Sequence, residues 1–290
     1  VCFGAWLILE GQMSIGMLYA YISYKRYFSD AMVQVAQKLL DKNALKGPLD
    51  RVGDLLFAPS ETSQFGKRIV TSPVCLQFED VSFAYPGREA TLQHINMTLK
   101  QGEEAVIVGQ SGSGKTTLLR LISGMLLASS GTLRINKIPI EECDLSSLRQ
   151  HIRIVHADDI LFTGSILDNI ACFDSAPDKA GHCRVSAGGG GPRRRPAAAR
   201  HETEMLPGNT FFSAGEMQRL VLARALYSQP KLLLCDEVTA NLDKTTAQKV
   251  LANLRSLGIG LVFVTHSPDV VGCQGRLYTM ENGTLRENAP

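Results

Sequence analysis

The sequence has little net charge, a single tryptophan and no Cys-x-x-Cys pair among its 290 residues. Its 30 lysines and arginines nearly balance 28 aspartates and glutamates, so the formal net charge is only +2. A charge this small cannot create a strong field that attracts polyanions, which argues against a protein dedicated to nucleic acid. The seven cysteines follow neither zinc-ligand nor disulfide-framework spacing, so we expect reduced thiols in a hydrophobic core in a cytosolic setting.

The first residues contain no apolar run of the roughly 20 residues that a membrane-spanning helix requires. Residues 1–9 are apolar, Glu10 and Gly11 interrupt them, and residues 13–24 resume an apolar and aromatic run. We expect two membrane elements joined by a tight turn, belonging to the truncated end of a transmembrane domain. A buried hairpin of two helices in a soluble protein is the alternative that these residues leave open. A signal peptide is a poor alternative, because the run has no basic start and no small-residue cleavage site after the apolar core.

Three parts of the chain follow from composition. Residues 1–60 hold the apolar runs and an amphipathic helix, predicted over residues 27–56, that leaves the membrane. Residues 61–73 are polar and contain glycine, serine and proline, which predicts a linker. Residues 74–290 form the second domain, which begins with an alternating strand pattern over residues 74–87.

A glycine-rich loop follows the buried strand pattern of residues 105–108 and satisfies G-x-x-x-x-G-K-[ST] at every position. Glycines let successive backbone N–H groups surround phosphate oxygens, and the N-terminus of the next helix adds positive partial charge. The lysine is expected to reach the β and γ phosphates of ATP, and the threonine to ligate Mg²⁺. The loop consists of Gly109, Gln110, Ser111, Gly112, Ser113, Gly114, Lys115 and Thr116.

Acidic residues end a second buried strand pattern at residues 231–237, KLLLCDE. In a parallel sheet such a strand delivers its last side chains to the edge where ligands bind. Asp236 is expected to hold Mg²⁺ and Glu237 to polarise the attacking water as general base. A further strand pattern, LVFVTHS, ends at His266, which is placed to contact the γ phosphate.

Between these motifs stands FFSAGEMQRLVLARALYSQPKLLLCDEVTANLD, residues 211–243. It resembles the signature motif, Walker B strand and D-loop of ABC transporter ATPases, and it argues against a P-loop kinase or GTPase. The resemblance covers residues 74–290, while the first residues resemble the last membrane helices of ABC exporters, closest to bacteriocin and colicin V type peptide exporters. The fold class it implies is α/β, a P-loop NTPase ABC ATPase domain with a mixed sheet and a helical subdomain.

The resemblance also implies roles for residues outside the loop. It implies that an aromatic ring stacks on adenine, that signature residues contact the γ phosphate bound to a second, identical subunit, and that a D-loop acid couples the two sites. Glu237 and His266 are the catalytic pair in this scheme. The additional nucleotide-binding residues are Tyr85, Thr117, Ser213, Gly215 and Asp243.

Three departures from the family pattern stand out. The signature carries Ala214 and Glu216 where the family usually has glycine and glutamine, and Ala157 occupies the Q-loop glutamine position. A methyl group cannot ligate magnesium or hold water; the adjacent Asp158 is either a substitute or a surface acid. Residues 181–200 are rich in glycine, proline and arginine where the family has a helix, and we expect a paired frameshift there rather than a basic nucleic-acid patch.

Together these features predict the ATP-hydrolysing part of an ABC exporter, working as a homodimer with ATP and Mg²⁺. The resemblance implies a bacterial inner membrane protein whose ATPase domain faces the cytoplasm. Its cargo would be a peptide or small protein, with a periplasmic adaptor and an outer-membrane channel as further partners. The alternative is a truncated or frame-damaged remnant that binds ATP without coupling it to transport.

Overall fold

The computed structural model describes residues 2–58, 60–174, 204–205, 212–240, 242–266, 272 and 274–288. Residues 181–200, for which a frameshift is predicted, lie outside this described part. The chain divides into two units, residues 1–60 and residues 61–290.

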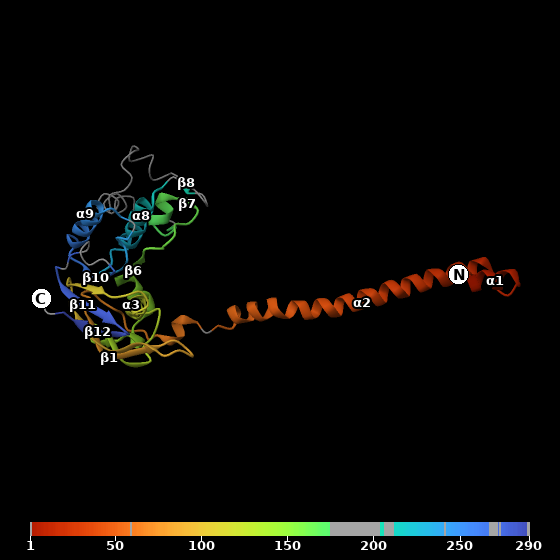
Figure 1. Cartoon of the computed structure of the whole chain (residues 1–290), viewed down its shortest axis with the longest axis horizontal. Helices are drawn as coiled ribbons and strands as arrows, with labels where there is room; N and C mark the ends of the chain where they lie inside the picture. The colour runs from red at the N-terminus through yellow and green to blue at the C-terminus, as the bar shows by residue number, and fades with distance from the viewer. Residues whose placement is uncertain are drawn as a thin grey trace. The chain divides into compact units, whose positions relative to one another are not determined.

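The first unit is a pair of helices joined by a short turn (Figure 1). Helix α1 spans Cys2–Leu9 and helix α2 spans Ile15–Leu56. Ser14 caps α2, since its side chain accepts a hydrogen bond from the backbone N–H of Met17 at 3.2 Å. The connectivity of two helices and a turn is as predicted, but α2 runs without a break through residues 24–27 and through Pro48.

Neither α1 nor α2 combines the length and apolarity needed to cross a bilayer, and no other helix in the described residues does. Helix α1 has only 8 residues, and α2, although 42 residues long, carries charged side chains along much of its course. The structure therefore contains the two helices and the turn that the sequence predicts, but no described helix is a complete membrane span.

The second unit contains two main sheets. The antiparallel sheet has the strand order β2-β1-β4-β5, with the strands Leu76–Ala84 (β1), Ala90–Leu99 (β2), Ser130–Ile135 (β4) and Ile138–Pro139 (β5). The larger sheet has the order β12-β11-β3-β10-β9-β6 and is parallel except for β12. Its strands are Glu104–Val108 (β3), Ile152–His156 (β6), Leu232–Asp236 (β9), Gly260–Thr265 (β10), Arg276–Glu281 (β11) and Thr284–Glu287 (β12).

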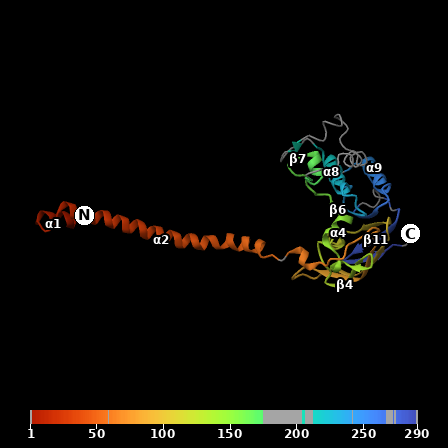
Figure 2. The same cartoon turned by 180° about the vertical axis from the view of Figure 1, so that it is seen from behind.

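Helices cover both faces of the larger sheet. Helix α3 (Lys115–Ile122) lies between the two sheets, whereas α8 (Ala214–Tyr227) and α9 (Lys244–Arg255) pack on the other face, as Figures 1 and 2 show. The shorter elements are η1 (Glu61–Gln64), η2 (Ile140–Glu142), α4 (Leu145–His151), α5 (Ile166–Ile170) and the two-residue strands β7 (Gly164–Ser165) and β8 (Glu204–Met205). This is the predicted mixed α/β architecture.

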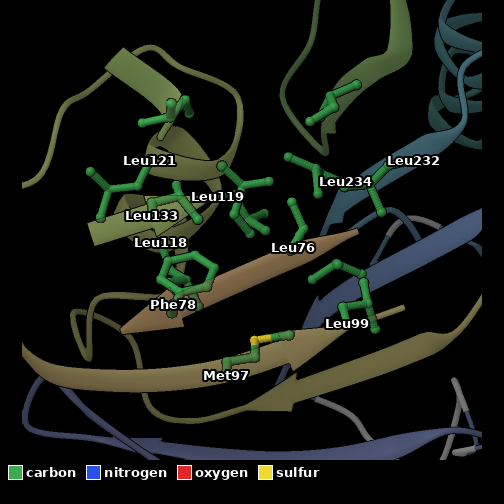
Figure 3. Close-up of a cluster of buried hydrophobic side chains, with 14 of the residues drawn as sticks. Leu76, Phe78, Met97, Leu99, Leu118, Leu119, Leu121, Leu133, Leu232 and Leu234 are labelled. Atoms are coloured by element: carbon green, nitrogen blue, oxygen red, sulfur yellow. The ribbon is translucent and has the colours of Figure 1, made fainter. Parts of the chain in front are cut away.

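The alternation of side chains along β9 explains how the two cores are divided. Leu232 and Leu234 point into the core between the sheets, while Leu233 and Cys235 point toward α8 and α9. Figure 3 shows the first of these cores, where leucines of α3 meet side chains of β1, β2, β4 and β9. Asp236, the last residue of β9, shares the parity of Leu232 and Leu234, so it faces α3.

The sequence predicts that the cysteines are buried in the core, and the structure confirms this for only some of them. All four cysteines whose side chains are described are free thiols. Cys143 and Cys235 are buried in the core, as expected, and Cys75 is half-buried. Cys172 is exposed, so the prediction of core thiols is wrong for this residue.

Candidate functional site

The glycine-rich loop connects β3 to α3 and turns sharply before the helix. Gly114 has a φ of +107°, and a Cβ at this position would lie 2.7 Å from Cδ2 of Leu92. Both facts require glycine, because other residues rarely adopt such a φ and the space is already filled. The Lys115 ammonium donates hydrogen bonds to the carbonyl oxygens of Gly109, at 2.8 Å, and Gln110, at 2.7 Å. The lysine is therefore bent back over its own loop.

Burial makes Lys115 electrostatically unusual. Its side chain is only 5% exposed. Burial lowers the pKa of Lys115 because the charged ammonium loses hydration, and the nearby carboxylates of Glu237 and Asp236 partly offset this effect. A poorly hydrated cation beside a glycine-rich loop is suited to attract a polyanionic ligand.

Asp236 is the centre of a small polar cluster at the end of β9. Its Oδ2 accepts hydrogen bonds from Oγ1 of Thr116, at 2.8 Å, and from Nδ1 of His156, at 3.1 Å. Burial raises the pKa of Asp236, but the hydrogen bonds from His156 and Thr116 outweigh burial and leave that pKa below its ordinary value. The same hydrogen bond to Asp236 raises the pKa of His156 against the opposing effect of burial. The cluster thus keeps Asp236 ionised.

Glu237 and His266 form a second pair beside this cluster. Nε2 of His266 lies 2.7 Å from Oε1 of Glu237, and both side chains are partly exposed. The backbone of Glu237 adopts a left-handed φ of +54°, and its N–H donates to the carbonyl of Val264 on the neighbouring strand. This strained turn aims the carboxylate toward the histidine that follows β10, so the Glu237 carboxylate and the His266 imidazole are in hydrogen-bond contact.

Tyr85 follows β1 and lies against the first turns of α3. Its hydroxyl lies 3.4 Å from Oγ1 of Thr117 and accepts a hydrogen bond of 3.4 Å from Arg120. Its ring packs edge-on against the ring of Phe83. The hydrogen bond with Thr117 lowers the pKa of Tyr85. The structure therefore places Tyr85 and Thr117 together at the helix that begins with Lys115, and adenine stacking by this ring stays a prediction.

The predicted signature and D-loop residues act as helix caps in this single chain. Ser213 caps α8: its Oγ accepts from the N–H of Glu216, at 3.3 Å, and the Glu216 carboxylate accepts from the Ser213 N–H, at 2.9 Å. Asp243 caps α9: its carboxylate accepts hydrogen bonds from the hydroxyl of Thr245 and from the N–H of Thr246, and these hydrogen bonds lower the pKa of Asp243. Within the described residues, no hydrogen bond or ion pair joins Ser213, Gly215 or Asp243 to the glycine-rich loop.

The residues at the loop fit ATP and magnesium. Thr116 and Asp236 supply a hydroxyl and a carboxylate, which are the oxygen donors that Mg²⁺ prefers, and they lie within 2.8 Å of each other. Oγ of Ser113 is buried and has no hydrogen-bond partner within the described chain, so the loop contains a polar group that a phosphate oxygen can satisfy. Thr116 and Asp236 would hold the cation, with Lys115 on the phosphates.

His156 is the residue of this cluster that the sequence interpretation missed. Ala157, one residue later, occupies the position where the family has glutamine. The structure places His156 at the end of β6 and in register with Asp236 of β9, whereas Asp158 is exposed. The available signal was the position of the histidine as the last residue of a strand pattern, IRIVH, that ends at the ligand-binding edge.

Comparison with known proteins identifies the class to which this fold and site belong. Residues 92–240 match the family model described as ABC transporter. That match covers half of the chain and includes the loop, the signature segment and Asp236. The chain belongs to the ABC transporter family.

Individual relatives agree with the family. The chain is 29% identical over 288 residues to the lactococcin-A transport/processing ATP-binding protein LcnC of Lactococcus lactis subsp. lactis, covering 99% of this chain and 40% of that protein. It is 32% identical over 274 residues to the probable microcin-H47 secretion/processing ATP-binding protein MchF of Escherichia coli, covering 91% of this chain and 38% of that protein. The chain thus spans about 40% of the length of these curated relatives.

A solved structure shows the same fold. A bacterial Atm1-family ABC exporter with ATP bound aligns over 95% of this chain and 50% of that chain, with a TM-score of 0.74 and 24% identity. The likeness extends over the ATPase domain and the preceding helices, which confirms the predicted fold class of an ABC ATPase domain preceded by helices.

Proposed function

We propose that this chain is the ATP-binding and ATP-hydrolysing part of a bacterial ABC exporter that moves a peptide or small protein across the inner membrane. One observation carries the proposal. The ends of β9 and β10 and the start of α3 bring Lys115, Thr116, Asp236, Glu237 and His266 to one edge of the sheet. This is the set of groups that phosphoryl transfer to water requires.

Each group has a distinct task in hydrolysis. The loop N–H groups and Lys115 bind and orient the phosphates, and Thr116 and Asp236 hold the cation. Magnesium, when bound, neutralises charge on the β and γ phosphates. Glu237 takes a proton from the attacking water, while His266, at 2.7 Å from its carboxylate, keeps that carboxylate aimed.

A second copy of the chain is part of the proposal. Ser213 is exposed at the start of α8 and the half-buried Gly215 lies in the first turn of that helix, and backbone N–H groups at a helix N-terminus suit an anion. In a head-to-tail homodimer they would contact the γ phosphate held by the partner, and Asp243 would couple the two sites. The loop and signature residues of one chain thus serve two different ATP molecules.

The cargo and location are proposed from the relatives. Their names state lactococcin-A transport, microcin-H47 secretion and alpha-hemolysin translocation, which are peptide or protein cargoes. We extend this to a peptide or small protein as the cargo, to the bacterial inner membrane with the ATPase domain on the cytoplasmic side, and to a periplasmic adaptor and outer-membrane channel as partners.

The test is ATP turnover by the purified chain. We expect Mg²⁺-dependent phosphate release that Glu237→Gln reduces by a factor on the order of 100 or more, because a positioned general base contributes that much. Glu79→Gln is the matched control: Glu79 also pairs with a basic side chain, Arg134 at 3.3 Å, but it lies on the antiparallel sheet. Equal rates for the two variants would refute the assignment of Glu237.

The remnant hypothesis makes a different prediction for the same protein. Ala157 at the Q-loop position favours it, because a methyl group cannot hold water or a cation. A remnant would bind ATP with no turnover above that of Glu237→Gln, whereas an active exporter domain would show a difference. Binding and turnover are therefore measured on the same preparation.

A further inference from the structure

Two neighbouring strands bring His156 and Asp236 together through sheet register. Strand β6 pairs in parallel with β9, and the last residue of each, His156 and Asp236, are Cα partners in the ladder. Ile152 and Ile154 of β6 contribute to the core around α3, so His156, with the same parity, also faces α3. The register, and not a flexible loop, thus sets the contact between the imidazole and the carboxylate.

The contact is specific to one oxygen of Asp236. Oδ2 accepts from Nδ1 of His156, at 3.1 Å, and from Oγ1 of Thr116, at 2.8 Å. A carboxylate only accepts, so the imidazole donates its Nδ1 proton. The start of the following loop is also fixed, since the N–H of His156 donates to Oδ2 of Asp159 at 3.1 Å, and Asp159 pairs with Arg224.

We propose that His156 is a positioning residue for magnesium: by donating to Asp236, it holds that carboxylate in the orientation that receives the cation of Mg–ATP. The inference rests on the proposed function. His156 supplies the site with a polar side chain at the end of the strand that leads to Ala157. The expected glutamine is missing at Ala157, and Asp158 is exposed to solvent. Side chains that orient a metal ligand typically change metal affinity by about 10- to 100-fold when they are removed.

Two substitutions separate the hydrogen bond from the bulk of the ring. His156→Ala removes the donor. His156→Asn keeps one, because the asparagine amide nitrogen is separated from Cα by the same number of bonds as Nδ1 of histidine. His94→Ala is the matched control, since His94 also donates from Nδ1 to an aspartate, Asp80 at 2.8 Å, but its side chain is 76% exposed on the antiparallel sheet.

The readout is nucleotide binding rather than turnover. Fluorescence titration of the full chain with MANT-ATP is carried out in Mg²⁺ and again in EDTA, and Mn²⁺ binding with ATP is followed by electron paramagnetic resonance. We expect His156→Ala to weaken MANT-ATP binding about tenfold in Mg²⁺ and less than twofold in EDTA. His156→Asn should restore binding to within about threefold, and His94→Ala should match the unaltered chain.

Several results would overturn the inference. These are unchanged or tighter binding by His156→Ala in Mg²⁺, an equal loss in Mg²⁺ and EDTA, or a folded His156→Asn that binds no better than alanine. Failure of the proposed function would look different: the unaltered chain itself would then show no Mg²⁺-dependent binding of MANT-ATP, and the inference would fall with it.

Discussion

Arg255, at the end of α9, is the cation of a buried ion pair with Glu104 at the start of β3. Its Nε and Nη2 donate to the two carboxylate oxygens of Glu104 at 2.6 and 2.8 Å. The two side chains are only 18% and 9% exposed. The pair connects the helix on one face of the larger sheet to a central strand, at the end of β3 opposite to the one that leads into the glycine-rich loop.

Replacement of Arg255 by methionine should destabilise the second unit strongly. Methionine fills similar space but leaves the Glu104 carboxylate buried without its cation, which typically costs about 3–5 kcal/mol. Glu104 keeps one hydrogen bond, from the N–H of Gln274 at 3.2 Å, so we expect the lower end, about 3 kcal/mol. For a unit of this size that is a fall in Tm of roughly 6–12 °C.

The double variant Glu104→Gln/Arg255→Met tests the reason for the loss. It removes both charges, so its free energy of unfolding should lie at least about 1 kcal/mol above that of Arg255→Met. Arg134→Met is the matched control, because Arg134 pairs with Glu79 at the surface, where such pairs contribute about 0–1 kcal/mol. Urea unfolding followed by circular dichroism measures all three. An Arg255→Met loss no larger than that of Arg134→Met would refute the reasoning.

Three further predictions concern packing, the loop and thiol chemistry. Leu251→Ala should lower the free energy of unfolding by about 2–5 kcal/mol because this side chain is fully buried. Leu257→Ala, at a half-exposed position, should change the free energy of unfolding by no more than about 0.5 kcal/mol, and urea unfolding measures both variants. Gly114→Ala should cost on the order of 1–3 kcal/mol in thermal unfolding and abolish MANT-ATP binding, because alanine is strained at a φ of +107°. Unchanged binding would contradict the loop geometry. Iodoacetamide at pH 8 should modify the exposed Cys172 but not Cys143, since burial raises the pKa of the Cys143 thiol to about 11. Peptide mass spectrometry measures the labelling of each cysteine, and equal labelling of the two would contradict this prediction.

Local patterns predicted the elements that carry the site. The apolar run before Asp236 is found as β9 and the run before His266 as β10, because buried parallel strands need apolar residues on both faces. The loop before α3 was equally visible, since its chemistry requires glycine and lysine at fixed spacing. Such features depend only on neighbours in sequence.

Features that depend on distant residues were not visible in this way. The contact between His156 and Asp236 joins residues 80 positions apart and exists only because of the register of β6 on β9. Most of the apolar run of residues 13–24 and the amphipathic helix predicted over residues 27–56 belong to one continuous helix, α2, which also runs through Pro48. The roles of Ser213 and Asp243 as caps are local and structural, and their predicted roles toward ATP depend on a second chain.

The strand order of the larger sheet also has a consequence for how the chain folds during synthesis. Within the part of the chain that the structure describes, β3, which leads into the glycine-rich loop, pairs with β10 and β11, and β6 pairs with β9 alone. All of these partners leave the ribosome after most of the second unit has been made. Until then β3 and β6 have open edges and apolar faces, and non-local pairings of this kind form slowly and expose the chain to aggregation. We therefore expect a nascent chain that stops before residue 232 to depend on chaperones, and to be unable to assemble the edge on which Asp236 and Lys115 meet.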